Sequence, residues 1–315
     1  MMSEKLLSTE ADDHIQELEA AITQIVQSWQ NRTLTGSLLQ AVYAPCGGGK
    51  TWLLQRWYKR WGGVLLDLHK SGHRSVIARI HSMQRSLENA PERHILFVDN
   101  VPNTEDELTK TFEEEILLSE LSAGNLVIQA QRQVNQVCWG GAIPHPPVRL
   151  IPALSLEGVK AVRRKFGLVS AFNSTETILF SEQETLPGLV QAWCDGRNHN
   201  TSEVDILRDY LANWWQCHSE EIPQNFSSWL LPLAVLACQN TFDHRTMLAG
   251  LSDLQRNTLE ASNIHFTENG LPFRLKMKRL ELMRPDGAWY VPMRTVLRAW
   301  LSLEKPHVYS CLNSN

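Results

Sequence analysis

The first half of the chain alternates short apolar runs with longer stretches in which apolar residues recur at helical spacing. Runs of four to six residues bounded by turns are typical of buried strands, and longer amphipathic stretches are typical of helices. The sequence predicts strands at 38–43, 64–68, 95–99, 125–130 and 148–151, and helices at 10–31, 52–57, 72–89 and 104–122. Strands that alternate with helices in this way predict a parallel, doubly wound α/β domain.

The second half of the chain has a different pattern. Residues 155–221 are mainly helical in their spacing, and further helical segments are expected at 227–239, 243–251, 252–262 and 293–303. Two short runs before the last helix flank Pro285-Asp286-Gly287, which is a hairpin signal, so this region indicates a winged-helix unit. We expect an N-terminal helix at 1–34, the α/β domain at 35–153, a helical domain at 154–222, a winged-helix domain at 223–305 and a tail at 306–315.

A glycine-rich octet, Ala-Pro-Cys-Gly-Gly-Gly-Lys-Thr at 44–51, joins the first predicted strand to a helix. Glycines let backbone N–H groups turn inward, and these groups bind polyphosphates together with the helix N-terminus. In this phosphate-binding loop (P-loop), Lys50 is expected to reach the β- and γ-phosphates and Thr51 to hold Mg²⁺. The other expected nucleotide contacts from this segment are Pro45, Cys46, Gly47, Gly48, Gly49 and Trp52.

The first position of this motif is usually glycine, and here it is Ala44. Alanine fits at this position if its φ is negative. The competing interpretation of the octet is a glycine-rich turn before an ordinary helix.

A carboxylate ends the third predicted strand, where Ile-Leu-Phe-Val precedes Asp99. Ligands bind at the carboxyl edge of parallel sheets, so we interpret Asp99 as the Walker B residue, which contacts Mg²⁺, usually through water. The alternative is an aspartate that opens the turn at 99–103. Because one more strand lies between the loop and Asp99, the first and third strands are not expected to be direct neighbours in the sheet.

The composition narrows the class of protein. The chain has 315 residues, a formal net charge of −4 and a pI of about 6.3, which gives no general basic excess for nucleic acid. Six cysteines without a C-x-x-C pair argue against a zinc site or a disulfide framework and suit a reducing compartment. Neither a signal-peptide pattern nor a long apolar run is present, so we expect a cytoplasmic protein without a membrane partner.

With the octet and Asp99, two further segments make the chain resemble the STAND group of P-loop ATPases, AAA+-related nucleotide switches of the NACHT, NB-ARC and MalT kind. The fourth strand runs into Gln131-Arg132, which is similar to the sensor 1 segment, where an arginine reads the γ-phosphate. Residues 185–190 resemble the G-x-P motif, with Thr185 in the glycine's place, and the resemblance puts Pro187 near the adenine. The alternative for Arg132 is an ordinary helix-entry arginine.

The resemblance also bears on the rate of hydrolysis and on the resting state. Many AAA+ ATPases follow the Walker B aspartate with a glutamate that activates water, whereas this chain has Asn100, which cannot accept a proton, so slow hydrolysis is expected. The acidic run 113–115 is a candidate substitute, although a solvated helix face is the expected role. Arg294 stands where the family has a histidine that contacts ADP; it is either a phosphate ligand or a surface residue.

The resemblance implies an ATP/ADP and Mg²⁺ switch that forms a homo-oligomer, or a complex with separate effector or sensor proteins, in a bacterial defence or signalling system. Two alternatives remain open. One is a DNA-handling AAA+ ATPase, a transposition regulator or loader, whose winged helix and basic stretches at 163–165 and 274–279 bind nucleic acid. The other is a scaffold that binds nucleotide without hydrolysing it.

Overall fold

The computed structural model describes residues 15–68, 75–101, 107–131, 146–180, 185–216, 226–240, 244–264, 282 and 289–314, the side chains of 226–229 and 244–246 excepted. The chain divides into two compact units. The first, His14–Pro152, is the α/β unit, and the second, which holds the residues from Ala153 onward, is the helical unit.

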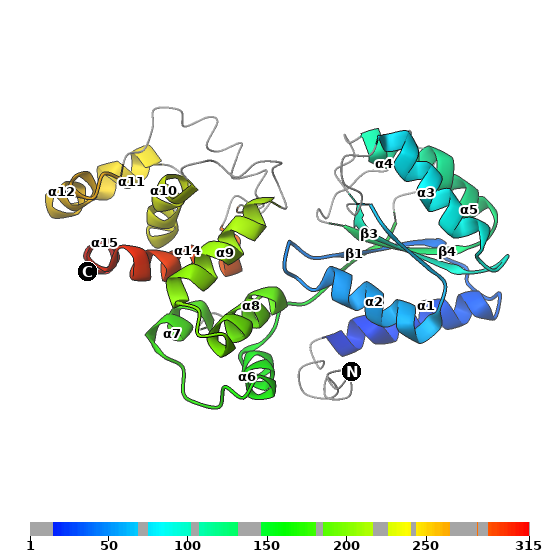
Figure 1. Cartoon of the computed structure of the whole chain (residues 1–315), viewed down its shortest axis with the longest axis horizontal. Coiled ribbons are helices and arrows are strands. Elements are labelled where there is room, and N and C mark those ends of the chain that lie inside the picture. The colour runs from blue at the N-terminus through cyan, green and yellow to red at the C-terminus, as the bar shows by residue number, and fades with distance from the viewer. Residues whose placement is uncertain are drawn as a thin grey trace. The chain divides into compact units, whose positions relative to one another are not determined.

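The α/β unit is built on a five-stranded sheet (Figure 1). Its strands, in the spatial order β2-β3-β4-β1-β5, are β1 (Leu39–Tyr43), β2 (Val64–Asp67), β3 (Ile95–Val101), β4 (Leu126–Gln131) and β5 (Val148–Leu150). All neighbouring strands are parallel, as the sequence predicts. Because β4 lies between β1 and β3, the expected separation of the loop strand from the Asp99 strand is confirmed.

Helices cover both faces of this sheet (Figure 1). One face carries α1 (Gln16–Gln30) and α2 (Lys50–Trp61), and the other carries α3 (Val76–Glu88), α4 (Glu107–Phe112), the π-helical turn η2 (Glu113–Leu117) and α5 (Leu118–Ser122). The strand residues alternate between the two cores as successive side chains of a strand must. Ile95 and Phe97 face α1 and α2, whereas Leu96 and Val98 face α3 and α4.

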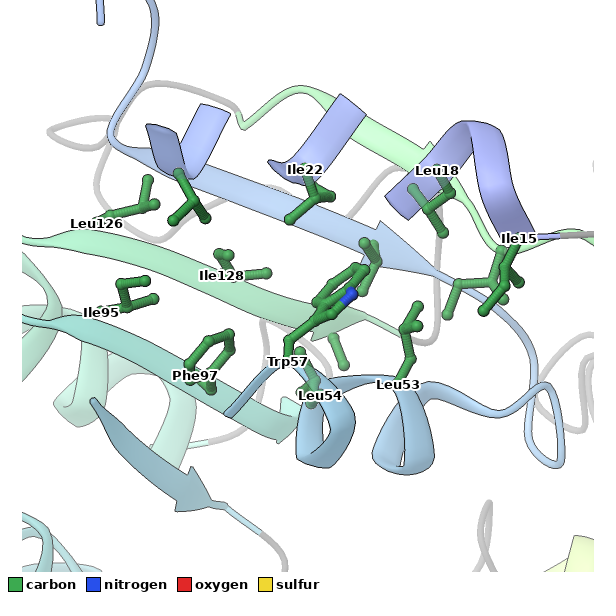
Figure 2. Close-up of a cluster of buried hydrophobic side chains, with 14 of the residues drawn as sticks. Ile15, Leu18, Ile22, Leu53, Leu54, Trp57, Ile95, Phe97, Leu126 and Ile128 are labelled. Carbon is green, nitrogen blue, oxygen red and sulfur yellow. The ribbon is translucent and has the colours of Figure 1, made fainter. Parts of the chain in front are cut away.

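Trp57 of α2 is fully buried in the core between α1, α2 and the sheet. Figure 2 shows its indole with Ile22 of α1 on one side and Leu54 of its own helix on the other. Ile15, Leu18, Ile22 and Val26 supply the α1 side of this core at helical spacing. One of the two helices that cover this face of the sheet, α1, therefore precedes the first strand in the chain.

The acidic helix expected at 104–122 contains the π-helical turn η2 at its centre. Glu114 and Glu115 are exposed, as expected for a solvated face, but Glu113 is buried. A π turn takes an extra residue per turn and so rotates the following side chains relative to an α-helix. Helical periodicity alone could not place Glu113 for this reason.

The helical unit contains α6 (Leu156–Lys165), α7 (Ser174–Phe180), α8 (Pro187–Asn198), α9 (Glu203–Gln216), α10 (Phe226–Cys238), α11 (His244–Gly250), α12 (Asp253–Ala261), α14 (Val291–Glu304) and α15 (Pro306–Asn313). α14 lies at its centre and packs against α7, α9, α10 and α15. Trp300 of α14 is fully buried. In the described part of the chain, no helix combines the length and apolar character needed to cross a lipid bilayer.

The hairpin expected around 285–287 lies outside the described residues, apart from its two ends. At these ends the Tyr290 N–H donates to the carbonyl of Leu282 at 2.9 Å. The helix that follows begins at Val291, two residues before the expected start, with Pro292 in its first turn. The winged-helix assignment stays a prediction.

Candidate functional site

The last residues of three adjacent strands are in register at the carboxyl edge of the sheet. Gln131 of β4 pairs with Tyr43 of β1 on one side and with Val101 of β3 on the other. The P-loop follows directly after Tyr43. Asp99 lies two residues before Val101, the last residue of β3. The sheet therefore brings the P-loop and the Asp99 strand to one edge, with Gln131 between them.

The P-loop has the backbone conformation that its glycines allow. Gly47 and Gly49 have positive φ values of 78° and 86°, which residues with a side chain rarely adopt. Between them the Gly48 N–H donates to the Pro45 carbonyl at 3.0 Å, and α2 begins directly afterwards at Lys50. The loop thus ends at the amino end of a helix, where backbone N–H groups and the helix dipole favour an anion.

Ala44 and Gly48 lie in close contact across the P-loop. Ala44 does not have a positive φ, so alanine fits at the position where the motif usually has glycine. A Cβ atom added to Gly48 would lie 2.4 Å from the Ala44 Cβ and 2.9 Å from the Pro45 carbonyl oxygen. The loop therefore tolerates a methyl group at position 44 because position 48 has none.

Lys50 is buried, and its ammonium lies against the P-loop carbonyls. Nζ donates to the carbonyl of Pro45 at 2.9 Å and also to that of Ala44. Burial of a cation is costly unless it is hydrogen-bonded, and the loop supplies these bonds. The side chain of Thr51, the next residue of α2, is exposed, and Cys46 is half-buried. The arrangement places a positive charge within the loop that the sequence predicts to bind phosphate.

Asp99 is buried, and the chain beyond it forms a bulge. The register between β3 and β4 shifts between Val98 and Val101. Asn100, at this bulge, has a φ of 53°, and its N–H donates to Oδ1 of Asp99 at 2.8 Å. Asparagine tolerates the left-handed region better than most residues with a side chain.

Asp67 is a polar residue of this edge that the sequence interpretation missed. It is the last residue of β2 and the register partner of Asp99, and its Oδ1 accepts a hydrogen bond from Nδ2 of Asn100 at 3.0 Å. The signal was available, because Asp67 stands near the end of an apolar run just as Asp99 does. The pairing of β2 with β3, which brings the two residues together, cannot be read from the sequence.

Gln131 was also missed as a site residue in its own right. Its side chain is fully buried, and neither Oε1 nor Nε2 has a hydrogen-bond partner among the described residues. A buried amide without partners costs free energy, and such groups are rare in folded proteins. The Gln131 amide, between the P-loop and β3, is suited to hydrogen-bond a polar ligand at this edge of the sheet. Arg132, the expected sensor arginine, lies outside the described residues.

Asp99 and Thr51 offer the oxygen ligands that a Mg²⁺ ion requires. Oxygen donors are what Mg²⁺ prefers, and the ion is usually held by one or two side chains together with water and substrate phosphates. Asp99 lies in β3 and Thr51 lies in the first turn of α2, which follows β1; β3 and β1 are the two strands that flank β4. Among the residues that the structure describes, no cluster of three or more His, Cys, Asp or Glu side chains offers a protein-only metal site.

Pro187 and Arg294, both expected to contact nucleotide, lie in the helical unit. Pro187 opens α8, where its missing N–H costs nothing, and Thr185 before it exchanges backbone hydrogen bonds with Leu154 at 2.8 and 3.2 Å. Arg294 Nε donates to the carbonyl of Ala237 in the last turn of α10 at 3.0 Å. A cation at this place also stabilises the end of α10 through the helix dipole.

The basic stretch at 163–165 is not uniformly available to phosphates. Arg163 is buried, and its guanidinium pairs with the Glu176 carboxylate at 3.2 Å. Arg164 and Lys165 are exposed. The second basic stretch, 274–279, lies outside the described residues.

The chain is similar in fold to one solved Walker-type ATPase. It matches the Walker-type ATPase PABY2304 of Pyrococcus abyssi with a TM-score of 0.53 and 12% identity, over 91% of this chain and 95% of that chain. A more distant match is the FIGL-1 AAA domain in complex with ADP, with a TM-score of 0.39 and 12% identity over 59% of this chain and 67% of that chain. No protein-family model and no curated protein matches the sequence. The parallel five-stranded sheet with its helices fits an α/β P-loop NTPase.

Proposed function

We propose that this protein is an ATP-binding, slowly hydrolysing molecular switch of the STAND type, whose bound nucleotide controls conformation and assembly. The observation that carries the proposal is the P-loop itself, which encloses the Lys50 ammonium and leads into the amino end of α2. Backbone amides, a helix dipole and a lysine at one point are what a polyphosphate requires. The fold shared with a Walker-type ATPase is compatible with this activity.

Each residue of the edge has a role in this proposal. Lys50 moves from the loop carbonyls to the β- and γ-phosphates when nucleotide binds. Thr51 and Asp99 hold Mg²⁺, which when bound neutralises phosphate charge. Pro45, Cys46, the three glycines and Trp52 surround the phosphates. Gln131, buried between the two strands, donates to a phosphate oxygen or to the attacking water.

Slow turnover follows from the residue after Asp99. The amide of Asn100 can hydrogen-bond to water and so orient it, but it cannot take up the proton that water loses on attack. A general base typically contributes about 10²–10⁴-fold to a rate. An enzyme without one spends a long time in its ATP-bound state, which suits a switch better than a motor.

A switch also requires that ATP and ADP bind its conformations with different affinities. We propose that Lys50 and Arg132 read the γ-phosphate. Pro187 and Arg294 are the other proposed nucleotide contacts. ATP then favours a form that assembles as a homo-oligomer or with separate effector or sensor proteins. We propose bacterial defence or signalling as the setting of such a switch, which is what the resemblance implies.

The test is to purify the full chain, identify its bound nucleotide, and compare wild type with Lys50→Ala. Wild type is expected to bind ATP, to release phosphate slowly and to change its oligomer size with ATP, and Lys50→Ala to lose all three. Lys59→Ala, which removes an exposed lysine from the same helix, is the matched control and should behave as wild type.

Two results would change the conclusion. If Lys50→Ala binds ATP and assembles as wild type does, the proposal is wrong. If wild type retains ATP and never releases phosphate, the protein is a nucleotide-bound scaffold instead of an ATPase.

A further inference from the structure

Asp67 holds the side-chain amide of Asn100 in one orientation. An amide has two different ends, an NH₂ group that only donates and an oxygen that only accepts. An ionised carboxylate accepts hydrogen bonds and donates none. Nδ2 of Asn100 donates to Oδ1 of Asp67 at 3.0 Å, so the carboxylate selects the donor end of the amide. Oδ1 of Asn100, the acceptor end, then points away from Asp67.

The backbone around this pair is fixed on both strands. Asp67 is the last residue of β2, in register with Asp99, and the N–H of Leu68 continues the ladder with a 3.0 Å hydrogen bond to the Asp99 carbonyl. On β3, the Asn100 N–H is bonded to the Asp99 carboxylate at 2.8 Å. Strand pairing therefore fixes the backbone of Asp67 beside that of Asp99, and the 3.0 Å hydrogen bond holds the Asp67 and Asn100 side chains together across the two strands.

We propose that Asp67 is a positioning residue for ATP hydrolysis, because it orients Asn100 so that Oδ1 accepts a hydrogen bond from the attacking water. The inference rests on the proposed function and adds to it a residue that supports the water site from the neighbouring strand. Asp67 acts through Asn100 and does not itself touch the reacting atoms.

The reaction that the pair serves is transfer of the γ-phosphoryl group of ATP to water. The water oxygen forms a bond to the γ-phosphorus, and the bond from this phosphorus to the β–γ bridging oxygen breaks, with its electron pair leaving on ADP. One water proton stays on the phosphate product, and the other passes to solvent. Asn100 holds the water in line for attack but takes no proton, so the gain comes from orientation alone.

An exchange of the two side chains separates orientation from proton transfer. In Asp67→Asn/Asn100→Asp the amide is on β2 and the carboxylate on β3, and the amide still donates to the carboxylate. The carboxylate at position 100 can then accept the proton that wild type releases to solvent. In Asn100→Asp alone, two carboxylates face each other, and their repulsion opposes the ionised form that a base requires.

The experiment measures single-turnover ATP hydrolysis and, separately, ATP affinity and thermal unfolding of the full chain. Asp67→Ala is expected to slow hydrolysis about tenfold while the ATP affinity changes less than about twofold. The double exchange is expected to hydrolyse ATP at least about tenfold faster than wild type and faster than Asn100→Asp. Glu92→Ala, which removes an exposed carboxylate just before β3, is the control for charge and should match wild type.

A merely structural role for Asp67 would lower the thermal stability or the ATP affinity together with the rate, whereas a positioning role lowers the hydrolysis rate alone. The inference is overturned if Asp67→Ala folds and hydrolyses ATP at the wild-type rate, or if the double exchange folds and is no faster than wild type. Asp67→Asn keeps the side-chain volume and replaces Asp67→Ala if the latter does not fold; it is expected to be slower than wild type because an amide selects neither end of Asn100. ATP binding that does not depend on Lys50 would instead remove the proposed function.

Discussion

The indole Nε1 of Trp193 donates a 2.9 Å hydrogen bond to Oε1 of Glu176 in the interior of the helical unit. The other carboxylate oxygen of Glu176 accepts from the Asn173 N–H at 3.0 Å and from the Arg163 guanidinium at 3.2 Å. Both charged side chains are buried, and the guanidinium lies 4.5 Å from the centre of the Phe172 ring. One carboxylate therefore connects α6, α7 and α8.

Glu176→Gln is expected to destabilise the helical unit by about 3 kcal/mol, because it leaves a buried guanidinium without its countercharge and puts an NH₂ group opposite existing donors. Urea unfolding followed by tryptophan fluorescence measures the loss. Glu157→Gln is the control, since the Glu157–Lys160 pair is exposed, and it should change stability within the error of measurement. Equal effects of the two changes would contradict a structural role for the buried pair.

Gly48→Ala is expected to weaken ATP binding about tenfold or more, which corresponds to about 1.4 kcal/mol or more. The added Cβ would lie 2.4 Å from the Ala44 Cβ, so the P-loop must move away from the position in which it holds Lys50. Isothermal titration with ATP measures the change. Gly36→Ala is the control, because an added Cβ there meets nothing within 4 Å.

A second substitution tests the cause of that loss. Ala44→Gly/Gly48→Ala removes the methyl–methyl contact and leaves the 2.9 Å approach to the Pro45 carbonyl oxygen and a 3.5 Å contact with the Cα of residue 44. It is expected to recover part of the ATP affinity. If it binds ATP no better than Gly48→Ala, the contact with Ala44 is not the reason why position 48 requires glycine.

Trp57→Ala is expected to cost about 3–5 kcal/mol of stability, because it opens a cavity in the core between α1, α2 and the sheet. Chemical denaturation with circular dichroism at 222 nm, a wavelength that reports helix, is the measurement. Ile77→Ala, on an exposed position of α3, should cost less than about 0.5 kcal/mol. A small loss for Trp57→Ala would mean that the core refills the space.

The thiols of Cys194 and Cys238 are expected to alkylate slowly in the folded protein. Burial raises the pKa of Cys194 to about 12 and that of Cys238 to about 11, so the reactive thiolate is scarce at pH 8. The expected slowing against an ordinary thiol is about a thousandfold for Cys194 and about a hundredfold for Cys238. Both rates should rise as pH increases from 8 to 10, because each raised pKa lies above this range.

Peptide mapping after timed iodoacetamide treatment measures these rates, with urea-unfolded protein as the reference. Cys194 and Cys238 should then react like the other cysteines. Rapid modification of Cys194 in the folded state at pH 8 would contradict its burial beside Trp193 in α8.

Much of the α/β unit follows from the sequence, because its strands are short, continuous and bounded by turns. β1 was expected at 38–43 and runs Leu39–Tyr43, and β4 was expected at 125–130 and runs Leu126–Gln131. Buried parallel strands read as apolar runs, and the parallel arrangement follows from the helices between them. These signals lie within each segment and do not depend on which elements pack beside it.

The site residues that were missed depend on contacts between strands. In the sequence, Gln131 only marks the end of the fourth strand before Arg132, and its burial arises because β1 and β3 flank it. The left-handed backbone of Asn100 and its hydrogen bond to Asp67 depend on a bulge and on the pairing of β2 with β3. Periodicity reports which face of a strand is apolar and says nothing about a shift of register.

The position of α1 has a practical consequence for anyone who divides this chain. Its buried residues belong to the same core as Trp57 and Ile128, so a fragment that starts at residue 35 would expose a strip of apolar surface across the sheet. Such a fragment is expected to aggregate. The α/β unit that can be recombined, fused or expressed by itself therefore starts before Ile15, and a partner domain grafted onto it must be attached ahead of α1 instead of at the first strand.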